Sequence, residues 1–196
     1  PYTTLFRSGL PFLLDFFDVL GNRPRDGWRG YGTDVLVLAE VFAVNASLNA
    51  LFKYAVRRTR PLVYDPDPDA FTAEERADPD AALSFYSGHS SFSFSMATAY
   101  SYLFMRRHPG SKLVIPVWVV SESLAATTAA LRVVAGKHFV TDVLTGAAVG
   151  AAIGVLIPYL HARALPDRIA ALSGRQRFGV SPQIFLGGGG LLLTVY

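Results

Sequence analysis

The chain contains no cysteine among its 196 residues. This absence excludes a disulfide framework, a zinc site built on thiolates and a cysteine nucleophile. Charged residues are scarce as well, at 17%, against 51% hydrophobic residues and a mean hydropathy of +0.31. Such a composition is apolar-heavy for a soluble domain. Although the net charge is +3, there is no basic stripe with interleaved aromatic residues, so we expect no nucleic-acid partner.

The first eight residues are set apart from the rest of the chain. Residues 1–8 resemble the translated read-through of a sequencing adapter and do not follow a start methionine, so we interpret them as an artefact and leave them out of the fold prediction. On this interpretation the chain is truncated at its N-terminus, and earlier membrane spans or a signal peptide are missing. One helical domain is predicted over residues 9–165. Residues 166–196 form a tail of unknown structure, whose last part, residues 181–196, is either half of a β-hairpin or disordered.

Four apolar stretches predict an all-α, membrane-embedded helical bundle. They cover residues 35–51, 90–105, 113–130 and 143–160. Each is close to the ~20 residues that a helix needs to cross a bilayer. Polar side chains inside two of these stretches are expected to face other helices rather than lipid, because ionisable groups are costly at membrane depth. They are Glu40, Asn45, Asn49 and Glu122.

A row of glycines marks the fourth apolar stretch. Gly146, Gly150 and Gly154 recur at four-residue spacing and therefore share one helix face. Small residues in that arrangement allow a second helix to approach closely. An alternative is that glycine is merely frequent in this alanine-rich segment. We favour close helix packing.

The connecting segments alternate in charge. Arginine and lysine are concentrated in residues 21–33, in residues 106–112 and in the tail after residue 160. If every stretch spans the membrane, these segments lie on one side, which the positive-inside rule makes cytoplasmic. The opposite side then carries residues 53–86 and 132–138. Residues 65–80 are rich in aspartate and proline and are predicted to be a mobile loop, either a solvated spacer or a substrate lid.

The first polar motif runs from Lys53 to Arg60 and Pro61. Seven residues separate the two cations, so on a continuous helix they would share one face. A planar guanidinium and an ammonium aimed at one place suit a phosphate group. The helix is expected to stop before Pro61. Arg57 and Arg58 are interpreted as ordinary basic residues flanking a membrane span.

The second motif is Ser84-Phe-Tyr-Ser87-Gly88-His89, which opens the second apolar stretch. Ser87 is a candidate N-cap, and a helix N-terminus offers free backbone N–H groups to an anion. Gly88 permits close backbone approach to an oxyanion. His89 can donate a proton near neutral pH. The alternative is a capped helix that happens to contain a histidine.

The third motif contains Arg132, Gly136, His138 and Asp142. His138 and Asp142 are four residues apart, so on a helix the carboxylate could reach one ring nitrogen and leave the other as a nucleophile. Gly136 would let the chain bend so that Arg132 returns to the same place. The alternatives are a metal-binding or a core His–Asp pair. Because no third ligand occurs at metal-binding spacing, we predict no metal site.

The three motifs, in this order and spacing, resemble the type 2 phosphatidic acid phosphatase superfamily over about residues 35–160. The resemblance implies its haloperoxidase-like helical fold, a phosphohistidine formed on His138 with Asp142 orienting the ring, and His89 as the proton donor to the leaving oxygen. It implies that the phosphoryl group is held by Lys53, Arg60, Ser87, Gly88 and Arg132. No cofactor is implied. Two flanking positions depart from the family pattern, Tyr86 in place of proline and Leu131 in place of serine.

The resemblance also implies a function. The expected protein is an integral phosphatase of the bacterial inner membrane, with a lipid phosphate or pyrophosphate monoester as substrate and the bilayer as partner, and with its site facing the periplasm or exterior. The alternatives are a soluble non-specific acid phosphatase, a vanadate-dependent haloperoxidase and a membrane protein that has lost activity. His108 and His161 are expected to lie away from the site. The pattern assigns neither the substrate nor the oligomeric state.

Overall fold

The computed structural model describes residues 11, 13, 14, 16–18, 27–67, 69–172, 178–185 and 188–195. Residues 1–8, interpreted above as an artefact, lie outside these ranges. The chain divides into two compact units, Pro1–Pro158 and Tyr159–Tyr196. The first unit holds every residue of the three motifs.

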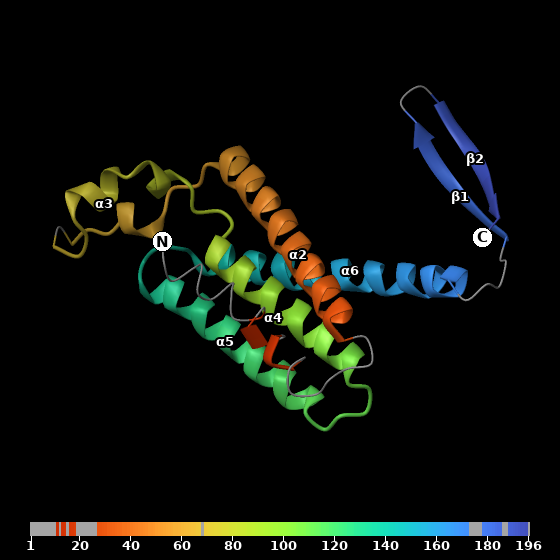
Figure 1. The fold of residues 1–196 in the computed structure, drawn as a ribbon. Helices are drawn as coiled ribbons and strands as arrows, with labels where there is room; N and C mark the ends of the chain where they lie inside the picture. The colour runs from red at the N-terminus through yellow and green to blue at the C-terminus, as the bar shows by residue number, and fades with distance from the viewer. Residues whose placement is uncertain are drawn as a thin grey trace. The chain divides into compact units, whose positions relative to one another are not determined.

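Four long helices build the first unit and lead out of it. They are α2 (Gly27–Val56), α4 (Gly88–Arg107), α5 (Val114–Val134) and α6 (Val140–Leu172). Between α2 and α4 the chain forms three short elements, η1 (Pro61–Val63), α3 (Ala73–Ala77) and η2 (Pro79–Ala82) (Figure 1). Each predicted apolar stretch lies inside one of the long helices, so the all-α prediction is confirmed for the bundle.

The C-terminal tail contains a β-hairpin. Strands β1 (Phe178–Phe185) and β2 (Gly188–Val195) pair antiparallel, with Phe178 opposite Val195 and Phe185 opposite Gly188. Of the two interpretations of the tail, the hairpin is therefore the one that the structure contains.

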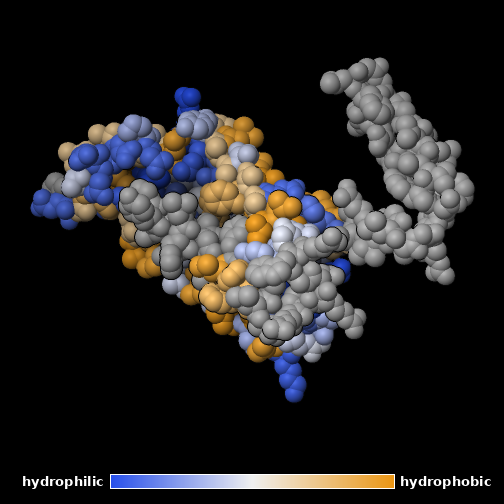
Figure 2. All heavy atoms as spheres, viewed as in Figure 1, coloured by the Kyte–Doolittle hydropathy of each residue, from blue (hydrophilic) through white to orange (hydrophobic). Residues whose placement is uncertain are grey.

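Three segments are long and apolar enough to cross a membrane by length and composition. They are Gly30–Val63, Val114–Val134 and Val140–Ala162, and large hydrophobic side chains such as Leu36 and Ile115 are exposed on them. Figure 2 shows hydrophobic residues along the flank of the helices and hydrophilic residues over the α3 end. These features make the chain a membrane protein. Contrary to the expectation of four spans, α4 does not meet the same criterion within the described residues, because serine and threonine dilute its apolar side chains.

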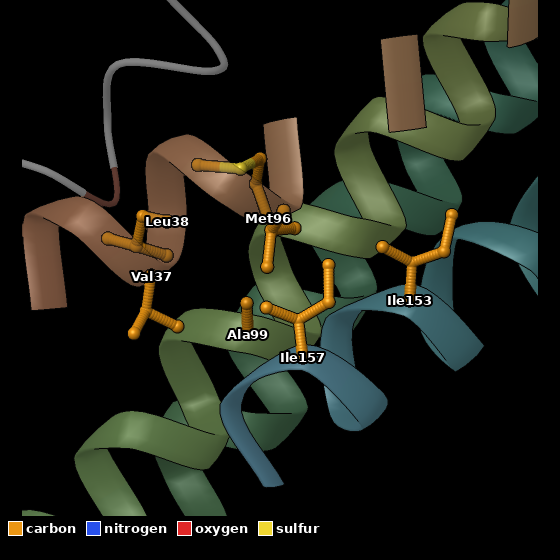
Figure 3. Close-up of a cluster of buried hydrophobic side chains, with 7 residues drawn as sticks. Val37, Leu38, Met96, Ala99, Ile153 and Ile157 are labelled. Carbon is orange, nitrogen blue, oxygen red and sulfur yellow. The ribbon is translucent and has the colours of Figure 1, made fainter. Parts of the chain in front are cut away.

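Helix α4 is central to the bundle because it packs against α2 and against α5. A buried apolar cluster joins α2, α4 and α6 (Figure 3). Its members are Val37, Leu38, Val41, Met96, Ala99, Ile153 and Ile157. Burial of these side chains fixes the relative position of three helices, and so of the motifs at their ends.

The glycine row of α6 lies directly against the backbone of α4. A Cβ atom added to Gly146, Gly150 or Gly154 would lie 2.6, 2.2 or 2.5 Å from a backbone carbonyl oxygen of α4 or its N-cap. The three oxygens belong to Ser87, Ser91 and Ser95. No side chain fits at these distances, so the prediction of close helix packing is confirmed.

Buried polar groups of α2 bind α4 and the residues before it. Asn45 donates to Ser95 Oγ at 3.3 Å and accepts from Ser91 Oγ at 2.5 Å. Asn49 Nδ2 donates to the Tyr86 carbonyl at 2.9 Å. Both asparagines are buried, as predicted, and these bonds satisfy groups that would otherwise be costly to bury.

The two glutamates of the apolar stretches behave differently. Glu122 of α5 accepts a hydrogen bond from Thr98 of α4 at 2.8 Å, which confirms that it faces a neighbouring helix. Glu40 is exposed on α2, so the same expectation is wrong for this residue. The helix period places it beside the face that Val37, Leu38 and Val41 bury, and not on that face.

The predicted mobile loop is folded. Thr72 and Glu75 form a reciprocal capping box at the start of α3. The Arg76 guanidinium donates to four backbone carbonyls, those of Leu62, Asp65, Asp67 and Phe71. Lys137 Nζ contacts Glu75 Oε1 at 2.8 Å, which ties this segment to the turn before α6. Composition predicted a mobile loop because it carries no information about specific bonds to backbone oxygens.

Candidate active site

Only the first part of the first motif is helical. Helix α2 ends at Val56, and Arg57 adopts a positive φ of 48°, so Lys53 lies on the helix and Arg60 in the extended segment after it. The expectation of one shared helix face is therefore wrong. The two cations still converge, because Asp80 accepts from Arg60 Nη2 at 2.5 Å and its other oxygen lies 3.6 Å from Lys53 Nζ.

The second motif begins α4 as predicted. Ser87 is the N-cap, and its buried hydroxyl accepts from the Ser90 backbone N–H at 3.4 Å. Gly88 is close to α2, since an added Cβ would lie 2.9 Å from Asn49 Oδ1. His89 follows in the first turn and is partly exposed. The glycine therefore serves helix packing, whatever it contributes to a bound anion.

The third motif folds into a turn before α6. Gly136 has φ +63°, which confirms the predicted bend, and an added Cβ there would lie 2.8 Å from Phe71. His138 belongs to this turn rather than to the helix, so the expected one-turn helical spacing to Asp142 is wrong. Its Nδ1 lies 3.8 Å from Asp142 Oδ2, which is longer than a hydrogen bond.

Ser84, the first residue of the second motif and one given no role there, contacts both this histidine and the carboxylate. Ser84 Oγ donates to Asp142 Oδ2 at 2.5 Å and is 3.4 Å from His138 Nδ1. All three side chains are buried, and the Ser87 backbone N–H donates to the Asp142 carbonyl at 3.0 Å. The second and third motifs are thereby joined at the N-terminal ends of α4 and α6.

The electrostatics of the imidazole are unusual. Burial, followed by the positive charges of Arg60, Arg132 and Lys53, lowers the pKa of His138 to about 3, against a smaller opposing effect of a hydrogen bond with the Ser84 backbone. Its ring is therefore neutral at physiological pH, as a nucleophile must be. Three cations from separate segments act on one buried ring, which brings Lys53, Arg60, Arg132 and His138 to one end of the bundle.

Three residues near these groups were missed by the sequence analysis. Arg58, interpreted as a span-flanking residue, donates from Nη1 to Asp142 Oδ1 at 2.7 Å. Ser84 precedes the Ser-Gly-His motif by three positions, and Asp80 comes from the acidic loop. No spacing rule marks them, because their contacts span 84, 58 and 20 residues of sequence. The signal that could have found them is Asp142, because a buried carboxylate needs several hydrogen-bond donors.

Two further histidines, His108 and His161, lie at the end of α4 and within α6. His108 ends α4 at the opposite end of that helix, as expected, where its Nε2 lies 2.8 Å from Asp18 Oδ2. His161 lies in the last part of α6, in the second unit. Within the described residues, no three histidine, aspartate or glutamate side chains gather closely enough to hold a metal ion.

Comparison with known proteins gave two matches. A sequence model of the PAP2 superfamily matches residues 34–166. A solved structure from Bacillus subtilis, described as a transmembrane PAP2 type phosphatidylglycerolphosphate phosphatase, is similar with a TM-score of 0.55. It is 25% identical in sequence, and the match covers 83% of this chain and 78% of that one. No curated protein sequence matched the chain.

Proposed function

Because the chain belongs to the PAP2 superfamily and is a membrane phosphatase of that superfamily, we propose that it hydrolyses a lipid phosphate or pyrophosphate monoester through a phosphohistidine on His138. The observation that carries this proposal is the environment of that ring. It is buried, and Lys53, Arg60 and Arg132 all act on it. A neutral nucleophile surrounded by fixed positive charge suits attack on an anionic phosphoryl group.

The reaction follows from these groups. His138 Nε2 attacks phosphorus, the bond from phosphorus to the leaving oxygen breaks, and His89 gives that oxygen its proton. Water then attacks the phosphorus, the bond from phosphorus to His138 Nε2 breaks to release inorganic phosphate and the neutral ring, and His89 takes up the proton that the water releases. Phosphoryl transfer requires charge stabilisation and in-line positioning more than covalent work, which is what the three cations supply.

Asp80 supports the assignment of Lys53 and Arg60 to the phosphate. One of its oxygens contacts each cation, so the two already hold a single anionic group. A phosphoryl group presents more charge and more acceptor oxygens than a carboxylate, and would take over these donors when it binds. Gly88 would add a backbone N–H at the start of α4, Ser87 its hydroxyl, since its own N–H already donates to the Asp142 carbonyl, and Arg132 a further guanidinium.

Charge favours one membrane orientation. Arg132 lies at the C-terminal end of α5, one of the three apolar segments, whereas the basic residues Arg106, Arg107 and Lys112 precede its N-terminal end. The positive-inside rule favours a cytoplasmic position for the basic end, and hence an extracytoplasmic position for the site. A site at that level suits a lipid whose tail remains in the bilayer, in the inner membrane of a bacterium.

A panel of phosphate-release assays tests this function. The panel contains phosphatidylglycerol phosphate, phosphatidate, an isoprenoid pyrophosphate and water-soluble p-nitrophenyl phosphate, each with and without EDTA. We expect release from at least one lipid, insensitivity to EDTA and loss of release in His138→Ala. His108→Gln is the control and should retain activity. Undiminished release by His138→Ala would remove the proposed nucleophile.

The same preparation separates the alternatives. Preference for p-nitrophenyl phosphate over every lipid would favour a non-specific acid phosphatase, although the three apolar segments favour a membrane substrate. Halide oxidation in the presence of vanadate, without phosphate release, would favour a haloperoxidase. Neither reaction, in well-folded protein, would indicate a site that has lost its activity.

A further inference from the structure

The Asp142 carboxylate makes its close contacts with groups other than the imidazole it was expected to orient. Its Oδ1 accepts from Arg58 Nη1 at 2.7 Å, and its Oδ2 accepts from Ser84 Oγ at 2.5 Å and from the Phe139 backbone N–H at 3.0 Å. His138 Nδ1 lies farther away, at 3.8 Å. A direct carboxylate–imidazole hydrogen bond is therefore absent from this arrangement, and the Ser84 hydroxyl contacts both groups.

The hydroxyl of Ser84 can serve both neighbours at once. It has one proton, and the 2.5 Å separation from Asp142 Oδ2 directs that proton to the carboxylate, which can only accept. The ring of His138 forms a hydrogen bond with the Ser84 backbone, and the Ser84 hydroxyl oxygen can in addition accept from Nδ1, 3.4 Å away. The ring then carries its proton on Nδ1, and its Nε2 lone pair is available for attack.

Arg58 completes a closed set of contacts with the same two residues. The Ser84 backbone N–H donates to the Arg58 carbonyl at 2.7 Å, while the Arg58 guanidinium donates to Asp142. The guanidinium also donates to Thr141 Oγ1 at 2.7 Å and lies 4.0 Å from the centre of the Phe139 ring. Arg58, Ser84 and Asp142 thus hold one another through three hydrogen bonds from three separate segments.

We propose that Ser84 and Arg58 are positioning residues of the phosphatase: Ser84 links Asp142 to His138 and sets the tautomer of the nucleophile, and Arg58 fixes the carboxylate that orients Ser84. The proposal rests on the proposed function of His138. Neither residue exchanges a proton or touches the phosphoryl group. As Nε2 bonds to phosphorus the ring becomes positive, and the hydroxyl dipole, held by the carboxylate, stabilises the charge at Nδ1.

Replacement of Ser84 gives the sharpest test. We expect Ser84→Ala to lower kcat about 10- to 100-fold, because a nucleophile with a wrong tautomer or orientation loses productive geometry. KM and the inhibition constant of orthovanadate, a phosphate mimic, should change less than about twofold, since the phosphate-binding cations are untouched. Ser84→Thr, which restores a hydroxyl, should recover most of kcat. An unchanged kcat in Ser84→Ala would overturn the proposal.

Ser90 provides a matched control. It is equally buried, and its hydroxyl donates to the Val143 carbonyl at 2.8 Å, so Ser90→Ala loses a buried hydrogen bond to the same region without touching His138. Its kcat should stay within about twofold of wild type. A fall equal to that of Ser84→Ala would attribute the effect to lost packing and contradict the proposal. Should Ser84→Ala aggregate, Ser84→Cys keeps the volume with a weak donor and should still lower kcat about tenfold.

Arg58 is tested by its effect on anion binding. We expect Arg58→Gln to lower kcat about tenfold with an unchanged inhibition constant for orthovanadate, and Arg58→Lys to do so less severely. A tenfold weaker inhibition by orthovanadate would instead make Arg58 a phosphate ligand and overturn its positioning role. Failure of this proposal is distinct from failure of the proposed function, because His138→Ala would still abolish release in the first case only.

Discussion

Two groups of histidine, aspartate and arginine lie at opposite ends of α4. At the C-terminal end, Asp18 Oδ2 lies 2.8 Å from His108 Nε2 and 3.3 Å from Arg107 Nη1. At the N-terminal end, Asp142 binds Arg58 directly, but its carboxylate is 3.8 Å from His138 Nδ1. The two groups share their composition, and the first has the shorter histidine–aspartate contact.

The surroundings distinguish the two ends. His138 is buried, with 1% of its side chain exposed, against 20% for His108. Three cations, Lys53, Arg60 and Arg132, lower the pKa of His138, and none of them is the arginine that binds Asp142. A histidine beside an aspartate is therefore no sufficient mark of a catalytic site. Burial together with positive charge directed at one ring makes the difference.

Removal of one of those cations should have the largest effect. Arg60→Gln takes away a donor that phosphate requires, and we expect kcat/KM to fall about 10²- to 10³-fold. Arg107→Gln, at the other end, should leave kcat/KM of the folded protein within about threefold while lowering its stability, because it breaks partly buried ion pairs. Steady-state assays on both purified variants make the comparison. Equal losses would mean that the two ends do not differ in the way described.

The buried imidazole should also leave a mark on stability against pH. The pKa of His138 is about 3 in the folded protein and near 6.5 in the unfolded chain. At a pH between these values the unfolded chain binds a proton on His138 and the folded protein does not. Stability is therefore lost as pH falls below about 6.5, by up to about 1.4 kcal/mol per unit. Thermal unfolding of His138→Gln in detergent should show a shallower decline. Identical slopes in wild type and variant would contradict the assigned pKa.

The glycine row offers a comparison along one helix seam. Gly146 lies against the Ser87 carbonyl beside the site, whereas Gly154 lies against Ser95, two turns farther from it. Both alanine variants should lose about 1–3 kcal/mol of stability through overpacking. Only Gly146→Ala should also lower kcat, by about tenfold, because it displaces Ser87 from Asp142. Gly32→Ala is the control, since nothing lies within 4 Å of its added Cβ. Equal kcat in both seam variants would show that the site tolerates the displacement.

The smallest expected change concerns Asp80. Its carboxylate is half exposed and competes with a bound phosphate for Lys53 and Arg60. Asp80→Asn should therefore lower the inhibition constant of orthovanadate about three- to tenfold, a modest effect because exposed ion pairs contribute little. A higher inhibition constant would mean that Asp80 supports the two cations instead of competing for them.

The sequence predicted the helices well, for physical reasons. Long apolar runs determine the helices because each must bury or shield its backbone, and the row from Gly146 to Gly154 marked the α4 contact because no side chain fits there. Spacing also predicted the Ser87 cap and the bend at Gly136. These features are local, and each depends on residues within a few positions of one another.

The contacts that complete the site were not predictable in this way. Lys53 and Arg60 converge although the helix ends between them, and Arg58 reaches Asp142 from 84 positions away. Ser84 contacts both His138 and Asp142, where spacing alone suggested a direct contact between those two. Each of these depends on how α2, α4 and α6 pack together. Residue spacing within one segment carries no information about that packing.

In the proposed reaction His138 becomes phosphorylated, and this phosphohistidine can be trapped. Enzyme mixed with a phosphorus-labelled lipid phosphate is quenched in alkali within one turnover, and the labelled peptide is identified by mass spectrometry. We predict an alkali-stable, acid-labile phosphate on His138, absent from His138→Ala and present in His108→Gln. Label on another residue, or label that persists in His138→Ala, would contradict the account.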